Sequence, residues 1–139
     1  TLQGHRKAVS YVHWVDDELI SASTDNTLKL WDIKRNDPRT ACVRTYVGHT
    51  NEKNFVGLSA NADGYVACGS EDNVVHVYAK HSSSPVACYS FAEKPTPMSH
   101  NRRDKAGFIS SVVWSPNSRY LLAANSRGHL KVLALNKAS

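Results

Sequence analysis

The sequence contains no apolar run near the 18 or so residues that a membrane-spanning helix needs, and it shows no signal-peptide pattern. We therefore expect no membrane partner. Hydrophobic residues make up 41% and charged residues 21% of the 139 positions, a balance that favours a soluble intracellular β protein.

Cysteine is scarce, and its spacing argues against two kinds of site. The three cysteines, Cys42, Cys68 and Cys88, are an odd number without a CxxC pair, which favours buried reduced thiols over disulfides or zinc. The seven histidines are scattered, with no HExxH motif and no Cys/His cluster. We therefore expect neither a metal nor a cofactor.

The net charge of +5 raises the possibility of a nucleic-acid partner. Most basic residues are spread through turns, and the one cluster, Arg102, Arg103 and Lys105, lies in a stretch over 93–107 without any alternating pattern. A solvated loop, mobile or partly disordered, is the favoured interpretation. A basic propeller that associates with nucleic acid remains the less favoured alternative.

Two Gly-His dipeptides show that the chain is built from repeats. Gly4-His5 and Gly48-His49 stand 44 residues apart, and the runs that they open end at Trp31-Asp32 and at Tyr78. This period and signature are typical of WD repeats, in which each repeat forms one four-stranded propeller blade.

The length limits how many blades the chain can hold. We predict an all-β fold with blades over 4–47 and 48–92, a loop over 93–107 and an incomplete blade over 108–135 without an outer strand. Propellers commonly have four to eight blades, so we expect a fragment of a longer ring with uncovered strand edges.

Short β-branched and aromatic runs separated by turn residues place the strands, and no segment favours a helix. We expect turns at Asp63-Gly64 and at 115–118, where proline suits a type I turn. The expected strands cover 9–15, 18–23, 27–33 and 41–47 in the first blade, 54–60, 65–70, 74–80 and 86–92 in the second, and 108–114, 120–126 and 129–135 in the third.

Several polar residues occupy positions where WD repeats place a buried hydrogen-bonded chain. A Ser-His-Asp hydrolase triad is rejected because no nucleophile elbow surrounds the serine. In the third blade Asn125, Arg127 and Leu133 stand at these positions, so we expect apolar packing to dominate there. The predicted structural network is His5, Ser23, Asp25 and Trp31 in the first blade, and His49, Ser70, Asp72 and Tyr78 in the second.

Residues just after each Gly-His dipeptide fall at the rim of the central channel. Lys7, Glu52 and Phe55 combine a cation, an anion and an aromatic ring, a set suited to gripping a short peptide. From the residues alone, however, packing of Phe55 between blades and ordinary solvation of Lys7 and Glu52 are the favoured interpretation.

A longer stretch, GHTNEKNFVGL over 48–58, is more specific than a generic WD repeat. Together with GHRKAVSYV, SASTDNTLKLWD, VACGSEDN and AANSRGHLKVLAL, it resembles the last three repeats of the constitutively photomorphogenic ubiquitin ligase and the suppressor-of-phytochrome-A proteins. The connector after Trp31-Asp32 and the segments 57–59 and 63–65 are closer to the suppressor branch.

The resemblance implies a seven-bladed, non-enzymatic substrate receptor of a cullin-type ubiquitin ligase in light signalling. Its peptides have a Val-Pro core near an acidic stretch, and by motif position the gripping residues are Lys7, Glu52 and Phe55. This reverses the interpretation from the residues alone. Phe55 would pack on the Val-Pro unit, Lys7 would pair with acidic residues, and Glu52 would accept a basic group or orient Lys7.

The same resemblance implies the partners and the compartment. The partners are Val-Pro-containing transcription factors or photoreceptors, a ligase adaptor docking on a box like Trp31-Asp32-Ile33-Lys34, and coiled-coil proteins bound through regions outside this sequence. The expected compartment is the nucleus, with the cytoplasm as a second one. The basic 93–107 stretch departs from a segment that is usually acidic in the family. A generic WD scaffold with unrelated partners remains the alternative.

Overall fold

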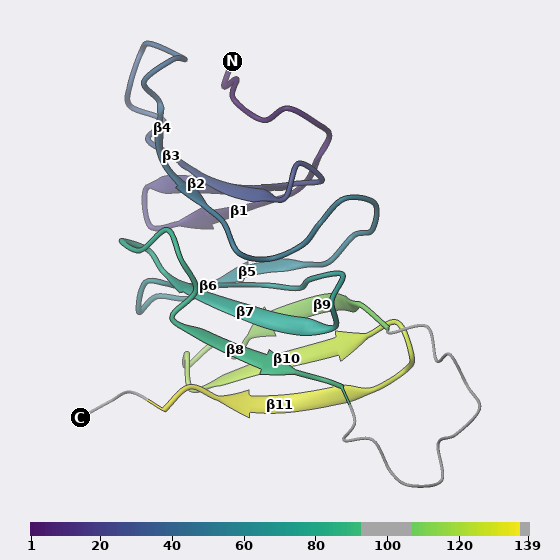
Figure 1. Ribbon diagram of the computed structural model, residues 1–139. Coiled ribbons are helices and arrows are strands. Elements are labelled where there is room, and N and C mark those ends of the chain that lie inside the picture. The colour runs from purple at the N-terminus through teal and green to yellow at the C-terminus, as the bar shows by residue number, and fades with distance from the viewer. Residues whose placement is uncertain (93–106, 137–139) are drawn as a thin grey trace, which may run out of the picture.

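The β-branched and aromatic runs form eleven strands in three antiparallel sheets, and strand order in each sheet follows the chain (Figure 1). The computed structural model describes residues 1–92 and 107–136. The first sheet contains β1 (Val9–Val15), β2 (Glu18–Ser23), β3 (Thr27–Trp31) and β4 (Cys42–Tyr46). The second contains β5 (Leu58–Ala60), β6 (Tyr65–Cys68), β7 (Val74–Ala79) and β8 (Ala87–Ser90). The third contains β9 (Ile109–Trp114), β10 (Tyr120–Asn125) and β11 (Leu130–Ala134).

The sheets stack as successive layers, so the described residues form part of a β-propeller (Figure 1). The predicted all-β fold is confirmed, with four, four and three strands in the three sheets. In the described ranges no helix is long and apolar enough to cross a membrane.

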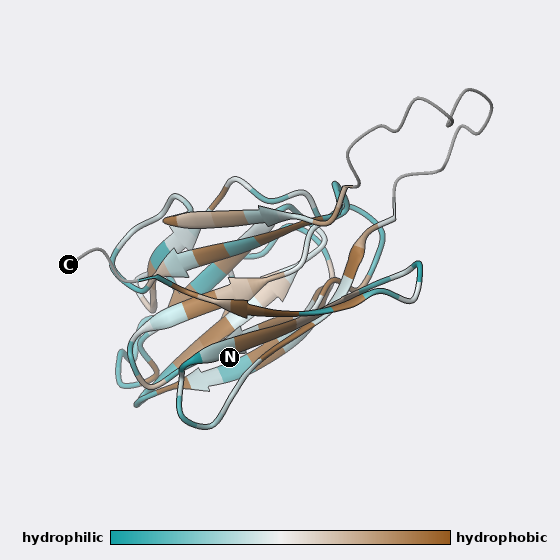
Figure 2. Cartoon of the chain, turned by 90° about the horizontal axis from the view of Figure 1, so that it is seen from below, coloured by the Kyte–Doolittle hydropathy of each residue, from teal (hydrophilic) through white to brown (hydrophobic). Residues whose placement is uncertain are grey.

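Two hydrophobic clusters hold the layers together, one in each gap between sheets. Figure 2 shows hydrophobic residues, in brown, along strands of the stacked sheets. Each sheet alone leaves a face to be covered, so stacking supplies the apolar burial that stabilises it. The first cluster includes Ile20, Leu28, Tyr46, Val66 and Tyr78, and the second includes Val75, Phe91, Ile109, Trp114 and Leu121.

Gly69, just after β6, lies against the backbones of Val56 and Ile109. A Cβ atom on Gly69 would stand 1.9 Å from the carbonyl oxygen of Val56 and 2.6 Å from that of Ile109. Both are backbone atoms that cannot swing away, so only glycine fits this position.

Both predicted turns are present. Gly64 has a φ of +82°, a conformation that glycine adopts without steric cost, and its N–H bonds to the Asn61 carbonyl at 3.2 Å. In the 115–118 turn, the Ser118 N–H donates to the Ser115 carbonyl at 2.9 Å.

The predicted strand over 54–60 is wrong in its first half, because β5 begins only at Leu58. Gly57 has a φ of +81°, outside the strand region, and residues 51–54 are held in a loop by hydrogen bonds to the side chains of Asn26 and Glu71 in two neighbouring turns. The alternating pattern could not reveal those tertiary contacts.

Apolar side chains are exposed on the two outermost sheets. Val12 and Trp14 on β1 are 64% and 60% exposed, and Leu130 and Val132 on β11 are 63% and 64% exposed. These faces lack the covering layer that the second sheet has on both sides. The loop expected over 93–107, with Arg102, Arg103 and Lys105, falls almost wholly outside the described residues.

Candidate functional site

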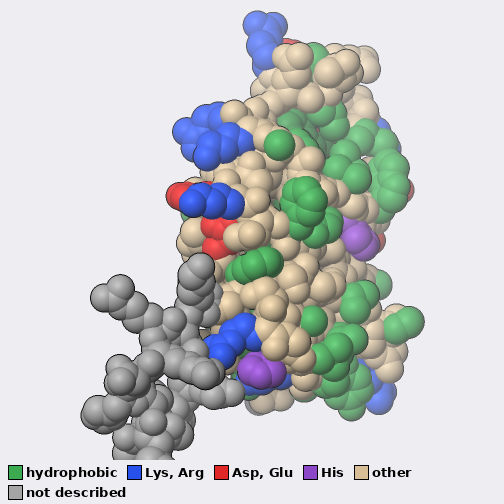
Figure 3. Space-filling view, turned by 90° about the vertical axis from the view of Figure 1, so that its right-hand side faces the viewer, with side chains coloured by type: hydrophobic (Ala, Val, Ile, Leu, Met, Phe, Trp, Pro, Cys, Tyr) green, Lys and Arg blue, Asp and Glu red, His purple; other side chains and the backbone are tan. Residues whose placement is uncertain are grey.

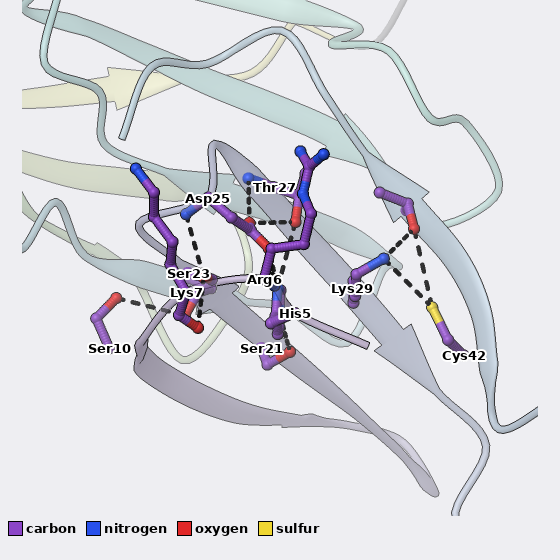
Figure 4. Close-up of polar contacts among 12 residues, drawn as sticks. His5, Arg6, Lys7, Ser10, Ser21, Ser23, Asp25, Thr27, Lys29 and Cys42 are labelled. Carbon is purple, nitrogen blue, oxygen red and sulfur yellow. Dashed lines mark hydrogen bonds and ion pairs between the residues drawn. The ribbon is translucent and has the colours of Figure 1, made fainter. Parts of the chain in front are cut away.

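A buried chain of polar side chains ties the first sheet to the segment that precedes it (Figure 4). His5 Nδ1 lies 3.0 Å from Asp25 Oδ2, and His5 Nε2 lies 2.7 Å from Ser21 Oγ. Trp31 Nε1 donates to the same Ser21 oxygen at 2.8 Å. The tryptophan, serine, histidine and aspartate therefore form one continuous chain across β2, β3 and the 24–26 turn.

The structure corrects the predicted serine of this chain. Ser23 does not bridge His5 and Trp31; its hydroxyl donates to the Lys7 carbonyl at 3.3 Å and accepts from the Asp25 N–H at 3.2 Å. Ser21 makes the bridge instead. Both serines lie on the same face of β2. Ser23 pairs with Thr27 beside the turn, whereas Ser21 lies two residues further along β2, toward the end that pairs with Trp31.

Ser21, His5 and Asp25 have the connectivity of a catalytic triad but not its accessibility. Ser21 is only 3% exposed, and its oxygen already accepts the Trp31 indole N–H. A nucleophile must reach a substrate and have an oxyanion hole beside it. The chain therefore has a structural role.

Asp25 is the anionic end of this chain. Burial by itself raises the pKa of Asp25, but the surrounding hydrogen bonds outweigh burial and hold the pKa at about 2. The donors are the Thr27 hydroxyl at 2.6 Å, the Arg6 backbone N–H at 2.9 Å and His5. Asp25 thereby fixes both its own turn and the segment that leads into β1.

The second sheet has a shorter version of the chain. His49 Nδ1 lies 3.0 Å from the Tyr78 hydroxyl, which donates to the Val47 carbonyl. Cys68 occupies the position of Ser21, so no hydroxyl links the histidine onward. Burial, assisted by the nearby His76, lowers the pKa of His49 to about 4, so the ring is neutral near pH 7.

The other two predicted residues of this sheet serve the backbone. The Ser70 hydroxyl accepts from the Thr50 N–H at 2.9 Å, and Asp72 accepts from the Val74 N–H at 3.2 Å. Asp72 also lies 3.7 Å from His76 Nε2. Asp72 therefore does not contact the Gly-His segment as Asp25 does.

In the third sheet Asn125 organises a turn and contacts the second sheet. Asn125 accepts backbone N–H bonds from Arg127 and His129, and its amide donates to Asn73 at 3.3 Å. Leu133 packs against the second hydrophobic cluster in place of a tryptophan. Apolar packing carries this sheet, as the sequence indicates.

Lys7 precedes β1, and Glu52 and Phe55 precede β5, so all three belong to segments that lead into the first strand of a sheet. Figure 3 shows one face of the molecule. Hydrophobic side chains lie in the middle of this face, with Lys and Arg side chains beside them. Lys7 and Glu52 are exposed, and Figure 4 shows the Lys7 amine directed away from the buried chain. Phe55 is 67% exposed and meets the Tyr11 ring edge-on, with centroids 6.0 Å apart.

One turn connects these segments. In the 23–26 turn, Ser23 bonds to the Lys7 carbonyl on one side. On the other side, the Asn26 N–H donates to the Asn51 carbonyl at 3.2 Å and its amide donates to Glu52 Oε1 at 3.4 Å. The structure thus brings the segments of Lys7 and Glu52 to the two sides of a single turn.

Glu71 is a residue of this region that sequence reasoning missed. Its carboxylate accepts the backbone N–H groups of Glu52, Lys53 and Asn54 at 3.0, 2.7 and 2.7 Å. Burial raises the pKa of Glu71, but these hydrogen bonds more than offset that effect and lower it below its ordinary value. The only signal in the sequence is an acidic residue in a turn, which does not reveal its partners.

The described residues offer no metal centre. Among residues 1–92 and 107–136, no group of three His, Cys, Asp or Glu side chains could hold a metal ion. The chemistry available at the rim is therefore that of an exposed ring, a cation and an anion on an ordered backbone.

Comparison with known proteins agrees with this geometry. The sequence matches the WD domain, G-beta repeat, over residues 1–32, 40–79 and 96–132. It is 50% identical to Protein SUPPRESSOR OF PHYA-105 1 of Arabidopsis thaliana over 142 residues, covering 97% of this chain and 14% of that protein. It is 52% identical to the E3 ubiquitin-protein ligase COP1 of the same plant, covering 95% of this chain and 19% of the ligase.

A third relative is the WD repeat-containing protein RUP2 of Arabidopsis thaliana, 42% identical over 95% of this chain and 35% of its own length. The chain thus spans about a seventh to a third of the length of these three relatives. Identities of 50% and 52% do not separate the ligase from the suppressor branch. The closer likeness to the suppressor branch stays a prediction.

Proposed function

Since the chain belongs to the WD-repeat family, and within it to the group of COP1 and SUPPRESSOR OF PHYA-105 1, we propose that it forms part of a peptide-recognition propeller in a ubiquitin ligase complex. The segment binds and does no chemistry itself. Its ligands are degron peptides with a Val-Pro core beside an acidic stretch, carried by transcription factors or photoreceptors in light signalling. An adaptor of the ligase is a further partner, and the nucleus, with the cytoplasm, is the compartment.

The observation that carries the proposal is the Phe55 ring, which stands 67% exposed on a hydrogen-bonded loop. A large apolar ring gains from being covered, and most binding energy at protein interfaces comes from a few aromatic or charged anchors. Packing against Tyr11 leaves most of the Phe55 ring open, so it can stack on a proline and a valine side chain.

The charged residues near Phe55, Lys7 and Glu52, would select peptides by the charge of the residues that flank the Val-Pro core. Lys7 is exposed and follows Arg6, which is also exposed, so this segment suits the acidic residues that flank the core. Glu52 is held by the Asn26 amide, which fits acceptance of a basic group from the ligand better than orientation of Lys7.

Replacement of Phe55 by alanine tests the proposal. In the complete protein that carries this chain, Phe55→Ala should weaken a synthetic Val-Pro peptide by about 2 kcal/mol or more, as expected of an aromatic hot spot. Titration calorimetry measures the affinity, and circular dichroism shows that the variant is folded. Tyr120→Ala is the matched control, because Tyr120 is 49% exposed at the start of β10, far along the strand from the rim. Unchanged affinity in folded Phe55→Ala would leave a WD scaffold with unrelated partners.

Reversal of charge at Lys7 tests the acidic flank separately. Lys7→Glu should weaken a Val-Pro peptide with acidic flanking residues more than the same peptide with neutral flanks, because only the first loses an ion pair. Titration calorimetry at low and moderate salt measures both affinities. Lys34→Glu, which changes an exposed lysine just after β3, is the control. Equal losses for the two peptides would argue against a role for Lys7 in charge recognition.

A further inference from the structure

The loop that precedes Phe55 is bound to a single carboxylate. Three successive backbone N–H groups, those of residues 52–54, point to the side chain of Glu71 at 2.7 to 3.0 Å, and the Asn54 side-chain amide adds a fourth bond at 3.2 Å. Consecutive N–H groups that converge in this way form an anion-binding nest. Here the anion is the Glu71 carboxylate of the same protein. Hydrogen bonds to an ionised group are stronger than hydrogen bonds between neutral groups.

The loop has three further attachments, two before this nest and one after it. The Asn51 N–H donates to Asn26 Oδ1 at 2.6 Å, which ties the loop to the first sheet. The Glu71 N–H donates to the Thr50 carbonyl at 2.8 Å, and Phe55 leans on Tyr11. Every residue from 50 to 55 is therefore held, yet the Phe55 ring stays open.

Among residues 1–92 and 107–136, the equivalent turns of the other sheets show no carboxylate that accepts successive backbone N–H groups. Thr24 stands at this position in the first sheet and makes a backbone bond to the Ala8 carbonyl. Ser126 in the third sheet accepts one N–H, that of Phe108, at 3.0 Å. Glu71 does not cap its own turn either, because Asp72 takes the Val74 N–H there. The carboxylate at position 71 is thus used for the Phe55 loop.

We propose that Glu71 is a positioning residue for peptide recognition, which orders residues 52–54 so that Phe55 is presented before a peptide arrives. This inference rests on the proposed function. A binding loop that must become ordered when it binds loses affinity, and a loop already ordered avoids that loss. In this proposal Glu71 does not itself contact the peptide, and with a peptide that has no basic group for Glu52 its effect passes through Phe55.

A double-mutant cycle on the complete protein tests this inference. Glu71→Gln keeps the size of the side chain but removes its charge and one acceptor oxygen. It should weaken an acidic-flanked Val-Pro peptide about tenfold in calorimetry, the effect of losing hydrogen bonds to a charged group. In the Phe55→Ala background the same change should have almost no effect. Glu18→Gln, which changes a half-buried carboxylate that pairs with Lys80 and not with this loop, is the control.

Hydrogen exchange provides a second readout that does not depend on the peptide. The backbone amides of residues 52–54 should exchange faster in Glu71→Gln, while those of β6 and β7 stay protected. If Glu71→Gln does not fold, Glu71→Asp, which keeps the charge but shortens the reach, should show the same effects at reduced size.

The possible failures can be told apart. If Phe55→Ala weakens the peptide but Glu71→Gln does not, the role of Glu71 is overturned and the proposed function stands. Equal losses from Glu71→Gln with and without Phe55 would also overturn it, because Glu71 would then act elsewhere. If Phe55→Ala has no effect, the proposed function fails and the role of Glu71 in recognition fails with it.

Discussion

Trp31→Ala is expected to lower the free energy of unfolding by about 3–5 kcal/mol, the usual cost of truncating a buried large aromatic residue. Trp31 is only 3% exposed, and its indole N–H donates to Ser21 at 2.8 Å. The change leaves a cavity between the first sheet and the Gly4-His5 segment, since Gly4 packs directly on the indole ring. It also removes one partner of a buried serine.

Two comparison variants separate the contributions. Trp31→Phe keeps most of the ring and loses the N–H, so it should cost clearly less than Trp31→Ala. Arg39→Ala changes a side chain that is 90% exposed and should have almost no effect. Denaturant unfolding of the complete protein gives the three values. If Trp31→Ala costs no more than Arg39→Ala, the indole does not hold the first sheet together.

The strands could be predicted because a half-buried strand shows its two-residue period in the sequence. The predicted strands over 9–15 and 18–23 have the same bounds as β1 and β2. The turn at Asp63-Gly64 was predictable because glycine readily adopts the positive φ found at Gly64. These features depend on neighbours in the chain. Sequence alone is sufficient wherever the local preference and the tertiary structure agree.

The errors arise where distant residues decide the structure. The sequence prediction named Ser23, whereas the Trp31 indole bonds to Ser21, a partner that depends on the register of β2 against β3. The sequence before β5 resembles a strand, but hydrogen bonds hold it in a loop. The Asn51 N–H bonds to Asn26, 25 residues away, and the Asn54 N–H bonds to Glu71, 17 residues away, so no local pattern reveals them. The spacing of Lys7 and Phe55 after the Gly-His dipeptides predicts that both lie at the rim. No sequence pattern predicts that the Glu71 carboxylate binds residues 52–54.

Acidification is expected to destabilise the protein between about pH 6.5 and pH 4, mainly through His49. The His49 ring is 4% exposed, and its Nδ1 lies against the Tyr78 hydroxyl, which itself donates to Val47. Nδ1 therefore carries the proton, and Nε2 has no hydrogen-bond partner among the described residues. A second proton would place a buried charge without an acceptor, which explains why the pKa falls from 6.5 to about 4.

The direction of the effect follows from the two pKa values. The folded state has the lower pKa, so the unfolded chain binds the proton first as the pH falls. The stability is complete above about pH 6.5 and declines until about pH 4, by about 3 kcal/mol in all at 1.36 kcal/mol per pKa unit. Burial lowers the pKa of His76 as well and adds to the same decline. Asp25, with a pKa near 2, acts only at still lower pH.

Unfolding free energies of the complete protein measured from pH 8 to pH 4 test the assignment to His49. His49→Gln should be less stable at pH 8 because it loses the Tyr78 contact, but its stability should fall much less between pH 6.5 and pH 4. His81→Gln, which changes an exposed histidine after β7, is the control for the loss of a histidine side chain. If His49→Gln keeps the full decline, another group takes up the proton, and His76, 6.3 Å from His49 between ring centroids, is the next residue to replace.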